Sequence, residues 1–108
     1  MVVDQVEVDR LFHALADATR RDIVRRTLSE QYSVSTLARE YPMSFAAVQK
    51  HVAVLADAGL VTKRRRGREQ LVSGDVRSVQ RARDVLDRFE ALWRARLDQF
   101  GEILATDP

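Results

Sequence analysis

Residues 43–61 read MSFAAVQKHVAVLADAGLV, and this stretch decides the fold. Ser44 stands where it can cap a helix, because a serine hydroxyl accepts a hydrogen bond from the open amides of a first helical turn. Residues 45–58 follow without a helix breaker, and Gly59 comes where a glycine commonly ends a helix in the left-handed conformation. The stretch therefore predicts a helix over residues 45–58.

The two faces of this helix differ in chemistry. Val48, Val52 and Leu55 fall in one narrow sector of a helical projection, which predicts the buried side. The opposite side combines small residues with a glutamine and a lysine: Ala46, Gln49, Lys50 and Ala53. Small side chains allow close approach to base edges, glutamine can pair with adenine, and lysine can reach guanine or a phosphate. This face predicts a DNA-reading helix with Ser44 donating to phosphate, and the alternative is an ordinary solvated face.

Two helices are predicted at the start of the chain. Over residues 4–16, one apolar face is formed at helical spacing by Val8, Leu11, Phe12 and Leu15. Asp17 then predicts the cap of a second helix over residues 18–30. We expect its inward side to be Ile23, Val24 and Leu28, and its outward side to be Arg20, Arg21, Arg25 and Arg26.

A short third helix is predicted just before the DNA-reading helix. Either Ser33 or Ser35 can cap it, and its expected buried side is Val34, Leu37 and Ala38. Tyr41-Pro42 must end it, because proline restricts the residue before it and has no amide hydrogen to donate.

Residues 60–74, LVTKRRRGREQLVSG, leave the helical period and place apolar ends around a charged centre. This pattern predicts a two-stranded antiparallel hairpin that turns near Arg66-Gly67-Arg68. Glu69 is the only acid beside the basic residues of the centre, which are Lys63, Arg64, Arg65, Arg66 and Arg68. The whole chain has a formal net charge of only +2, so the positive charge is concentrated here, as in an anchor for a polyanion. The alternative is a solvated charge run.

A long final helix is predicted after Asp75, which can cap it. Its apolar stripe consists of Val79, Ala82, Leu86, Phe89, Trp93, Leu97, Phe100 and Leu104. A small core cannot cover so long a stripe, and its exposure would leave a large apolar patch. We therefore expect a two-fold homodimer with the interface residues Leu11, Phe12, Leu86, Phe89, Trp93, Leu97, Phe100 and Leu104. The alternative is a helix that folds back on its own monomer.

The order of elements is four helices, a β-hairpin and a long helix, which is the layout of a mainly α winged helix-turn-helix protein. The 108 residues suit a single domain, with a helical core and wing over residues 8–73 and a dimerisation helix over residues 75–105. A two-fold dimer would set two reading helices about 34–36 Å apart and favour a palindromic operator in double-stranded DNA.

The stretch 43–61, with ALADATRRDIV before it and the RRRGRE hairpin after it, resembles the ArsR/SmtB family of bacterial winged-helix repressors. The family pattern is matched at Ser44, Val48, His51, Val52, Leu55, Ala58, Gly59, Leu60 and Val61. The resemblance covers residues 8–104 and implies a homodimer that binds operator DNA and represses its own or neighbouring genes. It also implies DNA contacts for Ser44, Gln49, Lys50 and His51, and places Arg64 to Arg68 at the wing tip. Where the family often has Asp-Pro-Thr-Arg, this chain has Asp17-Ala18-Thr19-Arg20.

We expect neither a metal nor any other cofactor. The chain has no cysteine, and the third-helix region reads Ser33-Val34-Ser35 where metal sensors of this family carry thiolates. The only two histidines are His13 and His51, and neither has a second histidine or a free carboxylate one helical turn later. A site shared across a dimer stays open. His13 is expected to be partly buried at the core edge, while His51 either contacts DNA or braces the helix-turn-helix.

Catalysis is not expected, because no nucleophile and base, glycine-rich phosphate cradle or paired carboxylates can be assembled from these residues. Acids near the start and short apolar runs indicate a cytoplasmic protein without a membrane partner. Two alternatives to plain repression stay open. One is a winged-helix module that binds an acidic protein, and the other is a repressor gated by an organic effector of unknown identity, bound near Phe12, Leu92 and Trp93.

Overall fold

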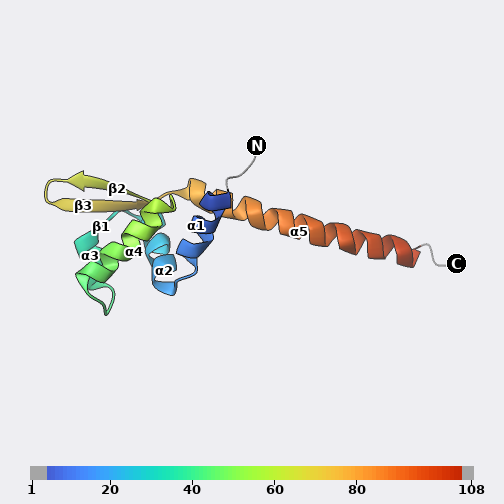
Figure 1. Ribbon diagram of the computed structural model, residues 1–108, viewed down its shortest axis with the longest axis horizontal. Coiled ribbons are helices and arrows are strands. Elements are labelled where there is room, and N and C mark those ends of the chain that lie inside the picture. The colour runs from blue at the N-terminus through green and yellow to red at the C-terminus, as the bar shows by residue number, and fades with distance from the viewer. Residues whose placement is uncertain (1–4, 106–108) are drawn as a thin grey trace.

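The computed structural model describes residues 5–105, which form a small body with one helix that projects from it. The body contains α1 (Gln5–Leu15), α2 (Ala18–Ser29), β1 (Tyr32–Ser33), α3 (Val34–Arg39), α4 (Phe45–Asp57), β2 (Val61–Arg66) and β3 (Glu69–Gly74), and the projecting helix is α5 (Val76–Ala105). The β2–β3 hairpin and α5 extend from the body in opposite directions (Figure 1). The molecule is accordingly elongated, at 74 × 31 × 21 Å.

The caps predicted from the sequence are confirmed. Asp17 accepts a hydrogen bond from the amide of Arg20 at 3.0 Å, and this bond is the main reason that the pKa of Asp17 is lowered. Ser33, rather than Ser35, caps α3 by accepting from the amide of Thr36 at 3.1 Å. At the start of α5, Asp75 accepts from the amide of Arg77 at 2.9 Å. The guanidinium of Arg77 also donates to this carboxylate and holds its pKa at about 2. Residue 4, where α1 was expected to start, lies outside the described residues.

The core of the body collects the apolar faces of α1 to α4 and the base of the hairpin. Its fully buried side chains include Ile23, Leu37, Val48, Val52, Leu55, Leu60 and Val72. From α5, only Ser78 and Ala82 near its start are buried. The Ser78 hydroxyl donates to the carbonyl of Gly59, which ties α5 to the end of α4.

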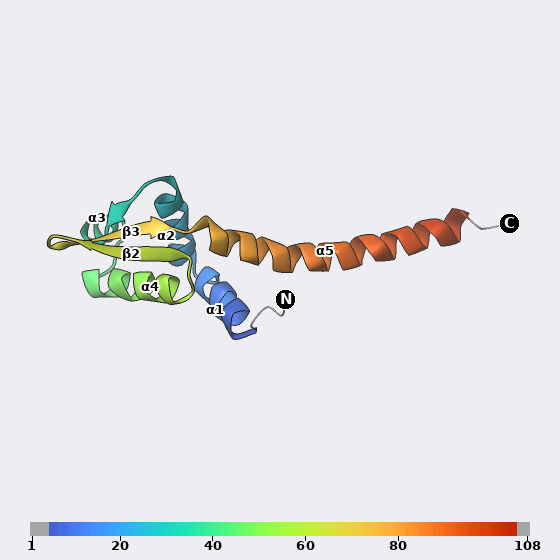
Figure 2. The same ribbon diagram turned by 90° about the horizontal axis from the view of Figure 1, so that it is seen from above.

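The sheet has three strands, not the two that the sequence predicted. The strand order is β1-β3-β2 and both pairings are antiparallel, with Tyr32 opposite Val72 and Arg66 opposite Glu69. The short strand β1 comes from the polar break between α2 and α3, and the side chain of Gln31 beside it donates to Ser73 at 3.0 Å. This third strand joins the base of the hairpin to the helix-turn-helix (Figure 2).

Leu28 is a further correction to the expected core. It is 43% exposed rather than buried in the core, and it lies against β3 at Gly74. A Cβ atom at Gly74 would approach Leu28 side-chain and backbone atoms to 2.8 Å, so the hairpin can sit this close to α2 only with glycine there.

Candidate nucleic-acid interface

Helix α4 begins with its first turn open to solvent. Ser44 caps it by accepting a hydrogen bond from the amide of Ala47 at 3.1 Å, while its own hydroxyl hydrogen is left to donate. Ser44, Phe45 and Ala46 are all exposed. An open helix N-terminus of this kind presents amide groups and a positive dipole end, both of which favour a phosphate.

The structure confirms that α4 has one buried and one open side. Val48, Val52 and Leu55 are buried in the core, whereas Gln49 and Lys50 are exposed. Ala46 shares the exposed side, and Ala53 is half-buried at its margin. Among residues 5–105, no side chain of α4 forms an ion pair. The outer side therefore combines small residues, an amide and a cation on a firmly packed helix.

The turn before α4 is anchored by a polar network that sequence reasoning missed. The hydroxyl of Tyr41 donates to Asp22 of α2 at 2.6 Å, and Arg26 and Arg25 donate to the same carboxylate at 2.8 and 2.6 Å. These three donors, Tyr41 foremost, hold the pKa of Asp22 well below its usual range. Burial, followed by the bond to Asp22, raises the pKa of Tyr41. The network fixes the entry of α4 against α2.

Arg20 is a second contact that was not foreseen. Its guanidinium donates to the carbonyls of Ala14 and His13 at 2.7 and 2.9 Å, and its Nη1 lies 3.4 Å from Nδ1 of His51. The prediction that Arg20 and Arg26 point outward is therefore wrong. Arg20 turns toward α1 and α4, and Arg26 bonds to Asp22. His51 is half-buried and faces Arg20, so the geometry supports the alternative in which it braces the helix-turn-helix. Its other ring nitrogen, Nε2, could still donate a hydrogen bond to DNA. His13, expected to be partly buried, is exposed.

The wing carries the concentrated positive charge. Lys63, Arg64, Arg65, Arg66 and Arg68 are all exposed, and none forms an ion pair with a described residue. Gly67 has a φ of 62°, so the two-residue turn Gly67-Arg68 adopts a backbone that suits glycine. Since the hairpin extends beyond the body, its cations are free to reach a polyanion (Figure 1).

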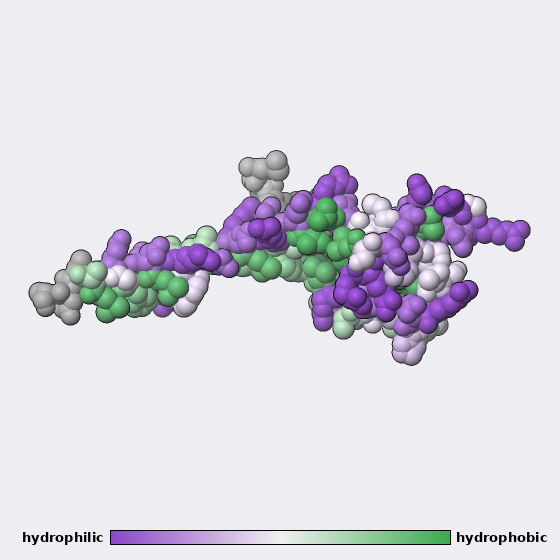
Figure 3. All heavy atoms as spheres, turned by 180° about the vertical axis from the view of Figure 1, so that it is seen from behind, coloured by the Kyte–Doolittle hydropathy of each residue, from purple (hydrophilic) through white to green (hydrophobic). Residues whose placement is uncertain are grey.

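Most of α5 presents an uncovered apolar stripe (Figure 3). Trp93 is 55% exposed and Leu104 is 76% exposed. The other large exposed apolar residues along the helix are Val76, Val79, Leu86, Phe89, Leu92, Leu97, Phe100 and Ile103. One predicted interface residue is corrected: Leu11 is only 3% exposed and packs in the core of its own chain, so it has no surface left to bury against a partner. Phe12 is half-buried against that core.

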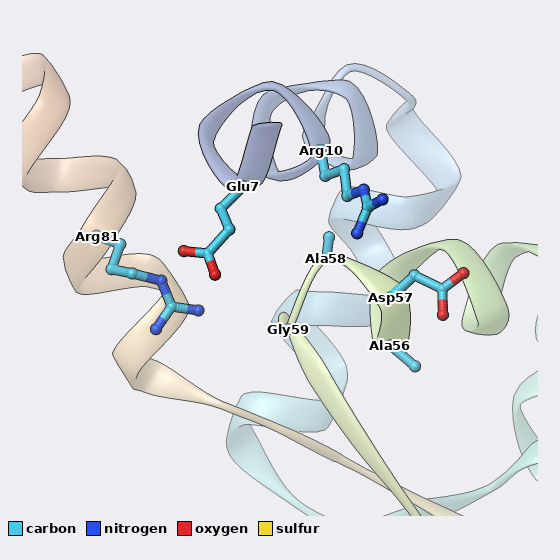
Figure 4. A pocket seen from close by; sticks show the side chains of 7 residues that line it. All are labelled: Glu7, Arg10, Ala56, Asp57, Ala58, Gly59 and Arg81. Atoms are coloured by element: carbon cyan, nitrogen blue, oxygen red, sulfur yellow. The ribbon is translucent and has the colours of Figure 1, made fainter. Parts of the chain in front are cut away.

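A cavity of about 190 Å³ lies where α1, the end of α4 and α5 meet. Figure 4 shows Glu7 of α1 pointing toward Arg81 of α5, and Arg10 pointing toward the end of α4. Asp57 and Gly59 also line the cavity. Its charged lining is balanced, with two arginines and two acids. A ligand pocket of Phe12, Leu92 and Trp93 requires a second chain, because Leu92 and Trp93 are exposed on α5.

Within residues 5–105, no three His, Asp or Glu side chains come together as metal ligands would. None of the helices in that range is both long and apolar enough to cross a membrane.

Comparison with known proteins agrees with this geometry. A helix-turn-helix domain family matches residues 15–64. The HTH-type transcriptional regulator Rv2034 of Mycobacterium tuberculosis is 36% identical over 99 residues, which are 92% of this chain and 90% of that protein. The fold and the sequence thus define a helix-turn-helix transcriptional regulator.

Solved structures narrow the class. An ArsR-like transcriptional regulator from a Rhodococcus species is 31% identical, covers 92% of this chain and 93% of its own, and superposes with a TM-score of 0.79. A protein described as a homodimeric winged helix-turn-helix DNA-binding domain, from Mycobacterium bovis, shares the fold at 24% identity and a TM-score of 0.61, with 91% of this chain and 84% of that one covered. The chain belongs to the ArsR family of winged-helix transcriptional regulators.

Proposed function

We propose that this protein is a homodimeric, sequence-specific repressor that binds a palindromic operator near its own or a neighbouring gene. The observation that carries the proposal is the exposed side of α4 beside an unpaired basic wing. Ala46, Gln49 and Lys50 offer base contacts on one element, and the wing arginines offer phosphate contacts on another. It acts by occupying DNA and not by catalysis.

The division of labour between the two elements follows from their chemistry. Gln49 can make two hydrogen bonds to one adenine, so it reads sequence. The arginines at positions 64, 65, 66 and 68 stand on a hairpin without acidic partners and serve as phosphate contacts, with Ser44 and Lys50 at the helix. His51, held by Arg20, contributes by orienting α4 or by donating from Nε2.

The homodimer rests on α5. An exposed stripe of this length on a charged helix leaves a large apolar surface in water, and pairing about a two-fold axis removes it. The axis sets two copies of α4 about one DNA turn apart, and the operator then repeats the same half-site in inverted orientation.

The direct test is a fluorescence-anisotropy titration against the DNA upstream of the gene and a shuffled duplex, over a series of salt concentrations. We expect a strong preference for the native duplex that persists at physiological salt. Equal binding to both duplexes that vanishes as salt rises would leave only the electrostatics of the wing.

Two substitutions separate the helix from the wing. Gln49→Ala should cost about 1–3 kcal/mol on the preferred duplex and relax the base preference. Arg66→Ala should weaken all duplexes alike and lower the salt slope by about one. A uniform loss from Gln49→Ala with unchanged preference would contradict the assignment of α4 as the reading helix.

A further inference from the structure

Phe45 is an apolar side chain that the fold of the body does not use. It is 47% exposed, although it is the first residue of α4 and the core begins one turn later at Val48. It is also absent from the partly buried residues that pack against the core, which include Tyr41 and Met43 just before it. Leaving so large an apolar ring in water forfeits the free energy of its burial.

The position of Phe45 is fixed by the helix cap. The hydrogen bond from Ala47 to Ser44 sets where α4 starts, so Phe45 cannot slide into the core without losing that bond. Gln49 follows four residues later and lies next to Phe45 along the helix surface. Phe45 thus extends the exposed surface that carries Gln49.

A second copy of the chain is a poor candidate for covering the Phe45 ring. The start of α4 lies at the end of the body away from the projecting part of α5, where the uncovered apolar stripe is found (Figure 1). The nearby exposed charges, Lys50 and the wing arginines, are positive and call for an anionic partner. In a DNA duplex, the apolar group that such a surface meets is the C5-methyl of thymine in the major groove.

We propose that Phe45 is a specificity-determining residue that packs on a thymine methyl group next to the base read by Gln49. This inference rests on the proposed function of α4. It adds the recognition of a thymine, which hydrogen bonds from Gln49 and Lys50 alone do not select. Each half-site should then favour a thymine at one fixed position, because cytosine lacks the methyl group and a purine presents no equivalent.

The experiment uses the full chain and replaces thymidine by deoxyuridine. A preferred duplex is first selected from a random library with the wild-type protein, and each thymine in it is then changed singly to uracil, which removes the methyl and keeps the pairing. We expect one position per half-site at which uracil weakens wild-type binding about fourfold, the effect of losing one buried methyl group. For Phe45→Ala, the same change should have no effect.

Two variants serve as controls. Gln49→Ala should bind more weakly but keep the uracil penalty, since it leaves the ring in place. Phe45→Leu retains an apolar side chain and should keep part of the penalty, and its thermal unfolding, together with that of Phe45→Ala, shows that α4 is intact.

The outcomes separate the inference from the function on which it rests. If the wild-type protein selects a duplex but no uracil penalty depends on Phe45, the inference is overturned and the proposed function stands. A loss from Phe45→Ala that is equal on thymine and uracil duplexes also overturns it, because the ring would then be wedging or packing without reading the methyl. If the wild-type protein prefers no duplex at all, both fail.

Discussion

Helices α4 and α5 each carry an apolar stripe, but the chain covers only the stripe of α4. Val48, Val52 and Leu55 are packed inside the body, whereas Phe89 and Trp93 are left in solvent. The two stripes look alike in sequence because both follow helical spacing. The difference shows that contacts within its own chain hold α4 in place, while most of α5 extends beyond the body and has no apolar surface of its own chain to pack against.

The largest effect that tests this difference is expected from charges placed in the stripe of α5. Phe89→Asp combined with Trp93→Asp should give monomers and weaken operator binding on the order of a thousandfold, because two carboxylates cannot be buried unpaired in an interface. Mass by light scattering and anisotropy titration measure both effects.

The matched control is Ala91→Asp with Ala95→Asp, which adds the same charge to exposed positions on the other side of α5. It should remain dimeric and bind DNA. A double variant at residues 89 and 93 that stays dimeric and still binds would show that the interface lies elsewhere.

A pair of leucine substitutions sharpens the comparison. Leu55→Ala in α4 should lower the free energy of unfolding by about 2–5 kcal/mol at any protein concentration, because it opens a cavity in the body. Leu97→Ala in α5 should instead lower stability only at protein concentrations where the dimer is populated, and the loss should shrink on dilution, because the lost contact is with a partner. Denaturant unfolding at two concentrations distinguishes them. Equal behaviour of the two variants would mean that both stripes are covered in the same way.

The smallest expected effect concerns the anchor of α4 on α2. Because hydrogen bonds lower the pKa of Asp22 from the ordinary value of 3.8, its contribution to stability is complete above about pH 4 and is lost as the pH falls below it. Asp22→Asn should cost about 1–2 kcal/mol near pH 7 and less near pH 3, without changing dimerisation. Asp84→Asn, at an exposed position of α5, is the control. A cost that does not shrink in acid would contradict the role of the carboxylate charge.

Much of the fold was predictable because its signals are local. The caps at Asp17 and Ser44, the glycine after α4 and the charged hairpin each depend on a few neighbouring residues. The short strand β1 was not predictable, since two residues show no periodicity and their partner, β3, is about forty positions away in the chain. Leu28 was misplaced for a related reason: its contact is with Gly74, far along the sequence.

The candidate interface was predictable from α4 and the wing, because the identities of Gln49, Lys50 and the arginines suggest their chemistry directly. The supporting contacts were not. Arg20 and Asp22 look like ordinary surface charges of α2, and only folding brings them to His51 and Tyr41. Phe45 could be placed on α4 from sequence, but its exposure depends on what the rest of the body leaves uncovered.

The sequence by itself determined where α2 and α4 start, which side of α4 is buried and where positive charge collects, since these properties depend on residues within a turn or two of one another. The tertiary structure alone decided that a third strand joins the wing, that Arg20 links three helices, and that Leu11 belongs to the core while the stripe of α5 stays open. Those outcomes depend on which segments, distant in the sequence, pack together. The free energy of that packing depends on the complementary shapes of the segments and not on the local sequence pattern.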